Sequence, residues 1–113
     1  MTAKNQLVQA PPYAVERAIK TLGQNLRTAR LRRELTIEDV ADKIGTGPKA
    51  VTDAERGKAT TSIAVYAALL WTYDLLSPFE ELANPLKDEQ GLALASRRAP
   101  ERARKVGGLD NDF

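Results

Sequence analysis

The sequence predicts an all-α fold, and three observations support this prediction. Apolar residues recur three or four positions apart in successive segments, as they do on one face of a helix. Proline and glycine stand where these segments begin and end. No stretch shows the strict alternation of polar and apolar residues that is typical of a half-buried strand.

The 113 residues have room for one domain with tails. We expect a flexible N-terminal arm over 1–11, a domain of five helices over 12–84, and a C-terminal tail over 85–113. The tail is basic, has one weak helical patch over 89–98, and is expected to be loosely ordered when alone. It is a candidate partner-binding segment.

The first predicted helix covers about 12–33, with Pro12 at its first turn, where the missing N–H costs little. Its basic residues make this segment strongly positive, although the net charge of the chain is only +2. Local positive surface, more than net charge, attracts a polyanion. The apolar stripe of this helix consists of Val15, Ile19, Leu22, Leu26 and Ala29.

A second helix is expected over 36–44. Thr36 and Asp39 have the Thr-x-x-Asp spacing of a capping box, and Gly45 can end the helix in the left-handed conformation. A third helix begins at Pro48 and ends at Gly57. A fourth, over 62–75, is apolar nearly all round and is expected to be central to the core. A short fifth helix, over 78–83, completes the domain.

The second and third helices form a predicted helix-turn-helix unit over about 36–56, because only a short turn containing glycine separates them. Ala41 and Val51 are small and fall where the two helices must cross. With that inner face fixed, the outer face of the third helix can enter the major groove of DNA, which is about 12 Å wide.

Residues 22–83 resemble the Cro/phage-repressor (XRE) helix-turn-helix domain. The resemblance rests on the strings LGQNLRTARLRRELT, EDVADKIG and VTDAERGK and on the long apolar helix after them. The Glu55-Arg56-Gly57 triplet is its most specific element. The resemblance implies a phage-repressor-like fold of five helices, in which Arg30 pairs with Glu55 as a structural contact.

The resemblance also implies which residues touch DNA. Bases would be read from the start of the third helix, and phosphates would be held by the start of the second helix and by the end of the third. Thr46, in the turn between them, belongs to the same surface. The implied DNA-binding residues are Thr36, Thr46, Gly47, Pro48, Lys49, Thr52, Asp53, Arg56 and Lys58.

Three positions depart from the pattern of that family. Ile37 stands where a phosphate-binding glutamine is usual, Pro48 replaces a commonly polar residue, and Thr61 stands where proline is common. The first two remove polar contacts, so the contact with DNA is expected to be shorter or to depend more on the arms.

For two of the charged residues of the third helix, Lys49 and Asp53, a functional and a plain interpretation compete. Lys49 could donate to guanine O6 and N7 or be a solvated lysine, and its place directly after Pro48 favours the groove. Asp53 could accept from a cytosine amino group, but a solvated acid is slightly favoured.

Outside the helix-turn-helix unit, four residues are candidates for dimer or partner contacts. Trp71 is equally consistent with a protein contact, where tryptophan is enriched, and with burial under the tail. Phe79 is more consistent with core closure, as are Leu82 and Leu86. Arg97 and Arg98 belong to a basic run for which a solvated tail is slightly favoured over binding.

The composition excludes several classes of function. Without cysteine or histidine the chain lacks thiolate nucleophiles, the commonest general base and the commonest metal ligand, so we expect no enzyme, metal site or cofactor. No signal-like or membrane-spanning apolar run is present, which indicates a soluble cytoplasmic protein without membrane contacts. We expect no small-molecule substrate, and scattered tyrosines argue against RNA recognition.

Two hypotheses remain. The first is a homodimeric transcriptional repressor that binds double-stranded DNA at a palindromic operator. The second is an antitoxin that binds and neutralises a HipA-like kinase toxin and regulates its own operon. It rests on a resemblance of the tail, PLKDEQGLALASRRAPERARK, to antitoxins of the HipB type. The two are compatible.

Overall fold

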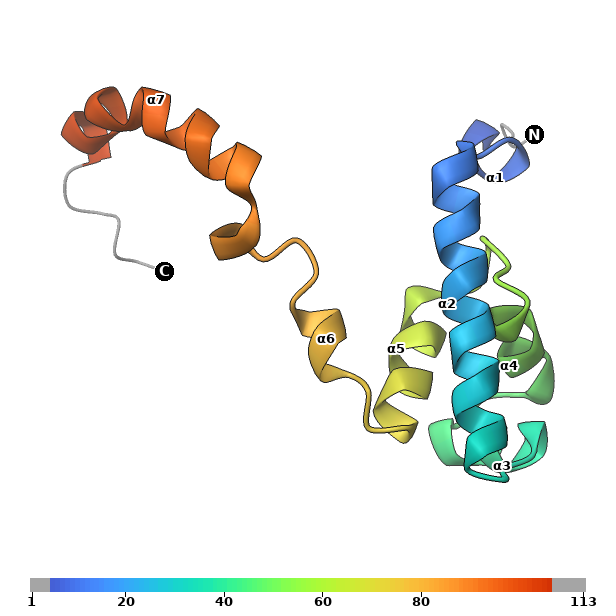
Figure 1. Ribbon diagram of the computed structural model, residues 1–113. Helices are drawn as coiled ribbons and strands as arrows, with labels where there is room; N and C mark the ends of the chain where they lie inside the picture. Colours follow the sequence, from blue (N-terminus) through green and yellow to red (C-terminus); the bar gives the residue numbers. More distant parts are fainter. Residues whose placement is uncertain (1–4, 107–113) are drawn as a thin grey trace. The chain divides into compact units, whose positions relative to one another are not determined.

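The computed structural model describes residues 5–106 and shows helices throughout this range, with no strand among those residues (Figure 1). The all-α prediction is therefore confirmed. The chain divides into two compact units, Met1–Phe79 and Glu80–Phe113. The division lies between Phe79 and Glu80, within the short helix that the sequence predicted over 78–83.

In the first unit, the long helix α2 (Tyr13–Arg32) packs against α4 (Pro48–Glu55). Pro12 precedes α2 as its N-cap, and Leu26 and Ala29 lie on its buried face. The helix ends where Glu34 takes a positive φ of 56°. The bounds of this helix agree closely with the predicted 12–33.

Both helices of the predicted helix-turn-helix unit are present, as α3 (Ile37–Ile44) and α4. Thr36 and Asp39 form the expected capping box, and Gly45 has φ 80° and ψ 40°, the left-handed conformation. The N–H groups of Gly45 and Thr46 both donate to the Ala41 carbonyl, which closes α3. Pro48 occupies the first turn of α4, as predicted.

Helix α5 (Ile63–Thr72) contacts both α3 and α4 and completes the core. Tyr66 and Leu69 on its inner face are buried, as is Tyr73 directly after it. Its outer face is apolar but not buried, since Ile63 is 70 % exposed and Trp71 is 56 % exposed. In Figure 1, α5 lies beside the α2–α4 pair and therefore packs with one face only. The buried core consists of Leu26, Ala29, Val40, Ala41, Val51, Ala54, Tyr66, Leu69 and Tyr73.

The expected arm over 1–11 is not wholly irregular. Residues Gln6–Gln9 form the single helical turn α1, where the Asn5 side chain accepts from the N–H of Leu7. This turn lies near the N-terminal end of α2 (Figure 1). The first four residues of the predicted arm lie outside the described range.

The C-terminal part contains α6 (Ser77–Glu80), a 3-10 turn η1 (Pro85–Lys87) and α7 (Glu89–Val106). Helix α7 has 18 residues and continues through Pro100, so the expectation of one weak helical patch over 89–98 was too short. Leu82 and Leu86 are 68 % and 81 % exposed, so the expectation that they close the core is wrong. The predicted polar end beyond Val106 lies outside the described residues. None of the helices described is long and apolar enough to cross a bilayer.

Candidate nucleic-acid interface

The outer face of α4 carries the polar residues that the sequence assigned to DNA. Gly47, Pro48 and Lys49 are exposed at its N-terminal end, and the Lys49 side chain is 78 % exposed. Thr52 and Asp53 are half-buried one turn later. Arg56 and Lys58 are exposed just beyond the end of the helix. These residues therefore lie along one stretch of accessible surface, from the turn before α4 to the loop after it.

Asp53 lies between two lysines on this surface. Its Oδ2 accepts a hydrogen bond from Lys49 Nζ at 2.9 Å and lies 3.8 Å from Lys58 Nζ. The hydrogen bond from Lys49 lowers the pKa of the Asp53 carboxyl, and the positive charges of Lys49 and Lys58 act in the same direction. Asp53 is therefore a paired carboxylate and not merely a solvated acid.

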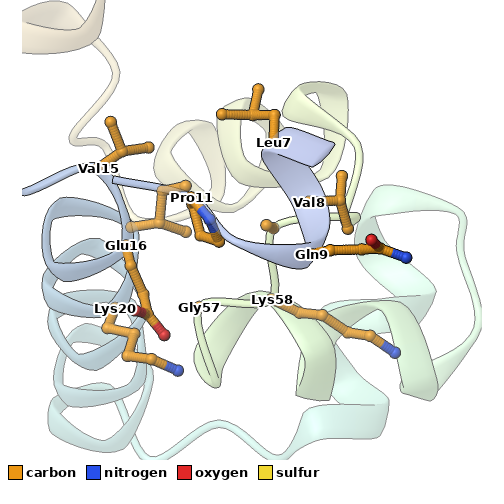
Figure 2. Close-up of a pocket in the computed structure, with 11 residues that line it drawn as sticks. Leu7, Val8, Gln9, Pro11, Val15, Glu16, Lys20, Gly57 and Lys58 are labelled. Carbon is orange, nitrogen blue, oxygen red and sulfur yellow. The ribbon is translucent and has the colours of Figure 1, made fainter. Parts of the chain in front are cut away.

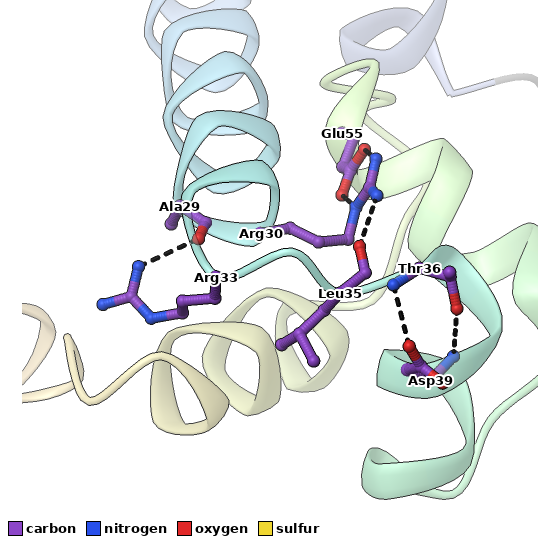
Figure 3. Close-up of polar contacts among 7 residues, drawn as sticks. All are labelled: Ala29, Arg30, Arg33, Leu35, Thr36, Asp39 and Glu55. Carbon is purple, nitrogen blue, oxygen red and sulfur yellow. Dashed lines mark hydrogen bonds and ion pairs between the residues drawn. The ribbon is translucent and has the colours of Figure 1, made fainter.

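At the start of α3, Thr36 is exposed, but it is already hydrogen-bonded to Asp39. Its Oγ1 accepts from the Asp39 N–H at 3.0 Å, and its own N–H donates to Asp39 Oδ2 at 2.9 Å (Figure 3). These hydrogen bonds lower the pKa of the Asp39 carboxyl. The Thr36 hydroxyl proton remains available to a phosphate, but the backbone N–H does not. Ile37, which stands in place of the usual glutamine, is half-buried against the core.

The inner side of α4 is held by the pair of Arg30 and Glu55. Arg30 Nε donates to Glu55 Oε2 at 2.7 Å and Nη2 donates to Oε1 at 3.0 Å, so the two groups meet as a fork (Figure 3). Arg30 Nη1 also donates to the Leu35 carbonyl at 2.9 Å. Both residues are buried, and the hydrogen bond to Glu55 raises the pKa of Arg30. The pairing expected between these residues is present.

Two glycines allow α2 and the end of α4 to approach closely. A Cβ on Gly23 would lie 2.6 Å from the Ala54 carbonyl oxygen and 2.7 Å from that of Glu55. A Cβ on Gly57 would lie 2.5 Å from the Cα of Lys20. Gly57 also has a φ of 69°, which residues with a side chain rarely adopt. The structural roles expected for Ala41 and Val51 also agree with their complete burial. Sequence reasoning missed Gly23, although an isolated glycine within a helical pattern is a signal of close packing.

A shallow cleft of about 330 Å³ adjoins this close contact, between α1, the start of α2 and the loop after α4 (Figure 2). Its apolar side includes Leu7 and Val15, and its polar side includes Glu16 and Lys20. Lys58 also lines this cleft, which places the α1 segment beside one residue of the candidate interface.

The four candidate partner residues are divided between the two units. In the first unit, Trp71 is exposed, and Lys43 Nζ lies 5.5 Å from the centre of its ring. Phe79, at the end of that unit, is half-buried. Arg97 and Arg98 are exposed on α7, in the second unit.

Comparison with protein families gives one match. The sequence model of a family described as a helix-turn-helix domain matches residues 21–82. The match covers α3, α4 and α5 in full and most of α2. Comparison with curated proteins and comparison with solved structures each give no significant match.

Proposed function

Because the chain belongs to the helix-turn-helix domain family, we propose that it is a sequence-specific DNA-binding protein that represses transcription. One observation carries this proposal: the buried face of α4 is fixed to the core, while its polar N-terminal face is exposed. A helix held in this way can enter the major groove without rearranging the domain. The finer assignment to the Cro/phage-repressor branch rests on the Glu55-Arg56-Gly57 triplet and on the pairing of Glu55 with Arg30.

In this proposal the bases are read by Gly47, Pro48, Lys49, Thr52 and Asp53, and the phosphates are held by Thr36, Thr46, Arg56 and Lys58. The chain acts as a binding protein in the cytoplasm and has no catalytic role. Two copies related by a two-fold axis would read the halves of a palindromic operator, with half-sites about 34 Å apart.

The proposal is tested by fluorescence anisotropy on the DNA upstream of the gene and on a scrambled duplex, across a salt series. We expect a preference for the upstream DNA of at least about 1000-fold. Lys49→Ala should remove about 1–3 kcal/mol of that preference. Lys87→Ala, which removes an exposed lysine in the second unit, is the matched control and should bind as the wild type does. Equal binding to both duplexes that disappears at moderate salt would contradict the proposal, because such contact is only electrostatic.

A second function is favoured by the exposed Trp71. Exposed tryptophans are common anchors of protein–protein contacts, and Trp71 is 56 % exposed. The ammonium group of Lys43 lies over its ring, 5.5 Å from the ring centre. We propose as an alternative that the chain is an antitoxin that binds a HipA-like kinase through Trp71, with Phe79, Arg97 and Arg98 as further candidate contacts. Calorimetric titration with a HipA-like kinase encoded beside this gene would test it. Trp71→Ala should weaken the complex at least 10-fold and leave DNA binding unchanged.

A further inference from the structure

The ion pair on the outer face of α4 has the pattern of one particular base pair. We propose that Lys49 and Asp53 together read a single G·C pair, with Lys49 on the guanine and Asp53 on the cytosine. This inference rests on the proposed function and adds the base specificity of its recognition helix. It makes Asp53 a specificity-determining residue.

The match is one of donors, acceptors and distance. In the major groove a G·C pair presents the acceptors N7 and O6 on guanine and the donor N4–H₂ on cytosine. O6 and N4 are hydrogen-bonded to each other, so they lie about 2.9 Å apart. Lys49 Nζ, a donor, and Asp53 Oδ2, an acceptor, lie 2.9 Å apart on the outer face of α4, where Lys49 is exposed and Asp53 is half-buried. The protein pair and the base pair can therefore meet edge to edge.

The other base pairs fit this arrangement less well. A·T and C·G present the donor and the acceptor in the opposite order, so each charge would face a group of the wrong kind. T·A keeps the order, but it sets the thymine methyl against the ammonium group and adenine N7 against the carboxylate. We therefore rank G·C first, T·A second, and the two reversed pairs last.

The charge of Asp53 explains why a mismatch is costly. A carboxylate on a DNA-facing surface is repelled by phosphate, and it is tolerated in the free protein because Lys49 and Lys58 are beside it. When those lysines also donate to DNA, they balance the charge of Asp53 less fully, and the cytosine N4–H₂ supplies the further donor that it needs. A polar group left unpaired in a desolvated interface discriminates strongly against the wrong ligand.

The experiment is selection of binding sites from a random duplex library by the full-length chain. Asp53→Asn is compared with Asp74→Asn, an exposed acid after α5 whose φ of 61° asparagine tolerates. The wild type and Asp74→Asn should both enrich a motif with one fixed G·C column. Asp53→Asn should keep the rest of the motif and relax the fixed G·C column. Circular dichroism of each variant checks that it is folded.

Anisotropy on the selected duplex then measures the size of the effect. Replacing that pair by A·T or C·G should weaken wild-type binding about 10- to 100-fold, with a smaller loss for T·A. Asp53→Asn should be clearly less sensitive to the same replacements and should keep only the discrimination that Lys49 provides. Lys49→Met provides a second variant and should relax the same column.

Three outcomes decide the matter. The inference is overturned if Asp53→Asn keeps the wild-type column, or if Lys49→Met and Asp53→Asn affect different columns. In both cases a wild-type motif is still enriched, so the proposed function stands. If the wild type enriches no motif, the proposed function fails first, and the inference fails with it.

Discussion

The two faces of α4 each carry an acid–base pair, and the two pairs differ in almost every other respect. On the inner face, Arg30 and Glu55 are buried and joined by two parallel hydrogen bonds of 2.7 and 3.0 Å. On the outer face, Lys49 donates one hydrogen bond of 2.9 Å to Asp53, and the Lys49 side chain is 78 % exposed. The same helix therefore holds one pair in place and leaves the other free.

The difference lies in geometry and solvent as much as in charge. A guanidinium meets a carboxylate as a rigid fork, so the inner pair fixes the direction of α4 against α2. An ammonium is a point charge on a flexible stem, so the outer pair can exchange partners at little cost. The inner pair serves the fold, while the outer pair is available to a ligand. Four predictions test this division.

The largest effect is expected from Glu55→Gln. It leaves the buried guanidinium of Arg30 without a counter-charge, and removal of one partner from a buried pair costs about 3–5 kcal/mol. The free energy of unfolding should fall by that amount in urea titration followed by circular dichroism. A loss below about 1 kcal/mol would contradict the structural role of the inner pair.

Gly23→Ala tests the close contact that supports the inner face. The new Cβ would lie 2.6–2.8 Å from backbone atoms of Ala54, Glu55 and Gly57, which cannot move aside as a side chain can. We expect a loss of about 2–3 kcal/mol, since overpacking of this kind outweighs the better helix propensity of alanine. Gly91→Ala is a contrast, because the nearest atoms to its Cβ belong to the exposed Asp88 side chain. Equal stability of Gly23→Ala and the wild type would show that α2 and α4 can separate freely.

Gly23 also shows where prediction from sequence ends. Local signals indicated the helices well: the capping box of Thr36 and Asp39, the left-handed Gly45 and the first-turn Pro48 are all present. They act within a few residues, so the sequence displays them directly. The contact of Gly23 with Ala54 joins residues far apart in the chain, so an isolated glycine can signal close packing but cannot show which segment packs against it. The pairing of Arg30 with Glu55 came from family resemblance and not from periodicity.

The same limit applies to the outer face and to the tail. The sequence placed Lys49 and Asp53 one turn apart, but it could not decide whether Asp53 was paired or solvated, because rotamers depend on the neighbours. The helical patch in the tail was predicted over 89–98 only, yet α7 continues through Pro100. Proline disfavours a helix interior without forbidding it.

The third prediction concerns Tyr73, the buried residue directly after α5. Burial, reinforced by the negative charge of Glu55, raises the pKa of Tyr73 to about 12. The unfolded tyrosine ionises near pH 10, so the contribution to stability is complete below pH 10 and declines as the pH rises towards 12. At pH 11 the stability that has been lost amounts to about 1 kcal/mol.

Tyr73→Phe should therefore flatten the alkaline loss of stability measured by urea titration between pH 9 and 11. At pH 7 the variant should be close to the wild type, because the buried Tyr73 hydroxyl has no hydrogen-bond partner. Tyr66→Phe is the comparison: its pKa is also raised by burial, but its hydroxyl donates to the Lys58 carbonyl. An alkaline profile unchanged by Tyr73→Phe would show that this ring is accessible to solvent.

The smallest effect on folding is expected from Asp53→Asn, two residues away from Glu55 and with the same change of charge. The hydrogen bond from Lys49 lowers the pKa of Asp53, so its small contribution is present above pH 4 and is lost as the pH falls below that value. Exposed ion pairs contribute little, so the melting temperature at pH 7 should stay close to that of the wild type. A drop as large as that of Glu55→Gln would mean that the outer pair also holds the fold. The Lys49–Asp53 pair would then serve the fold instead of being available to a base pair, and the division between the two faces of α4 would be lost.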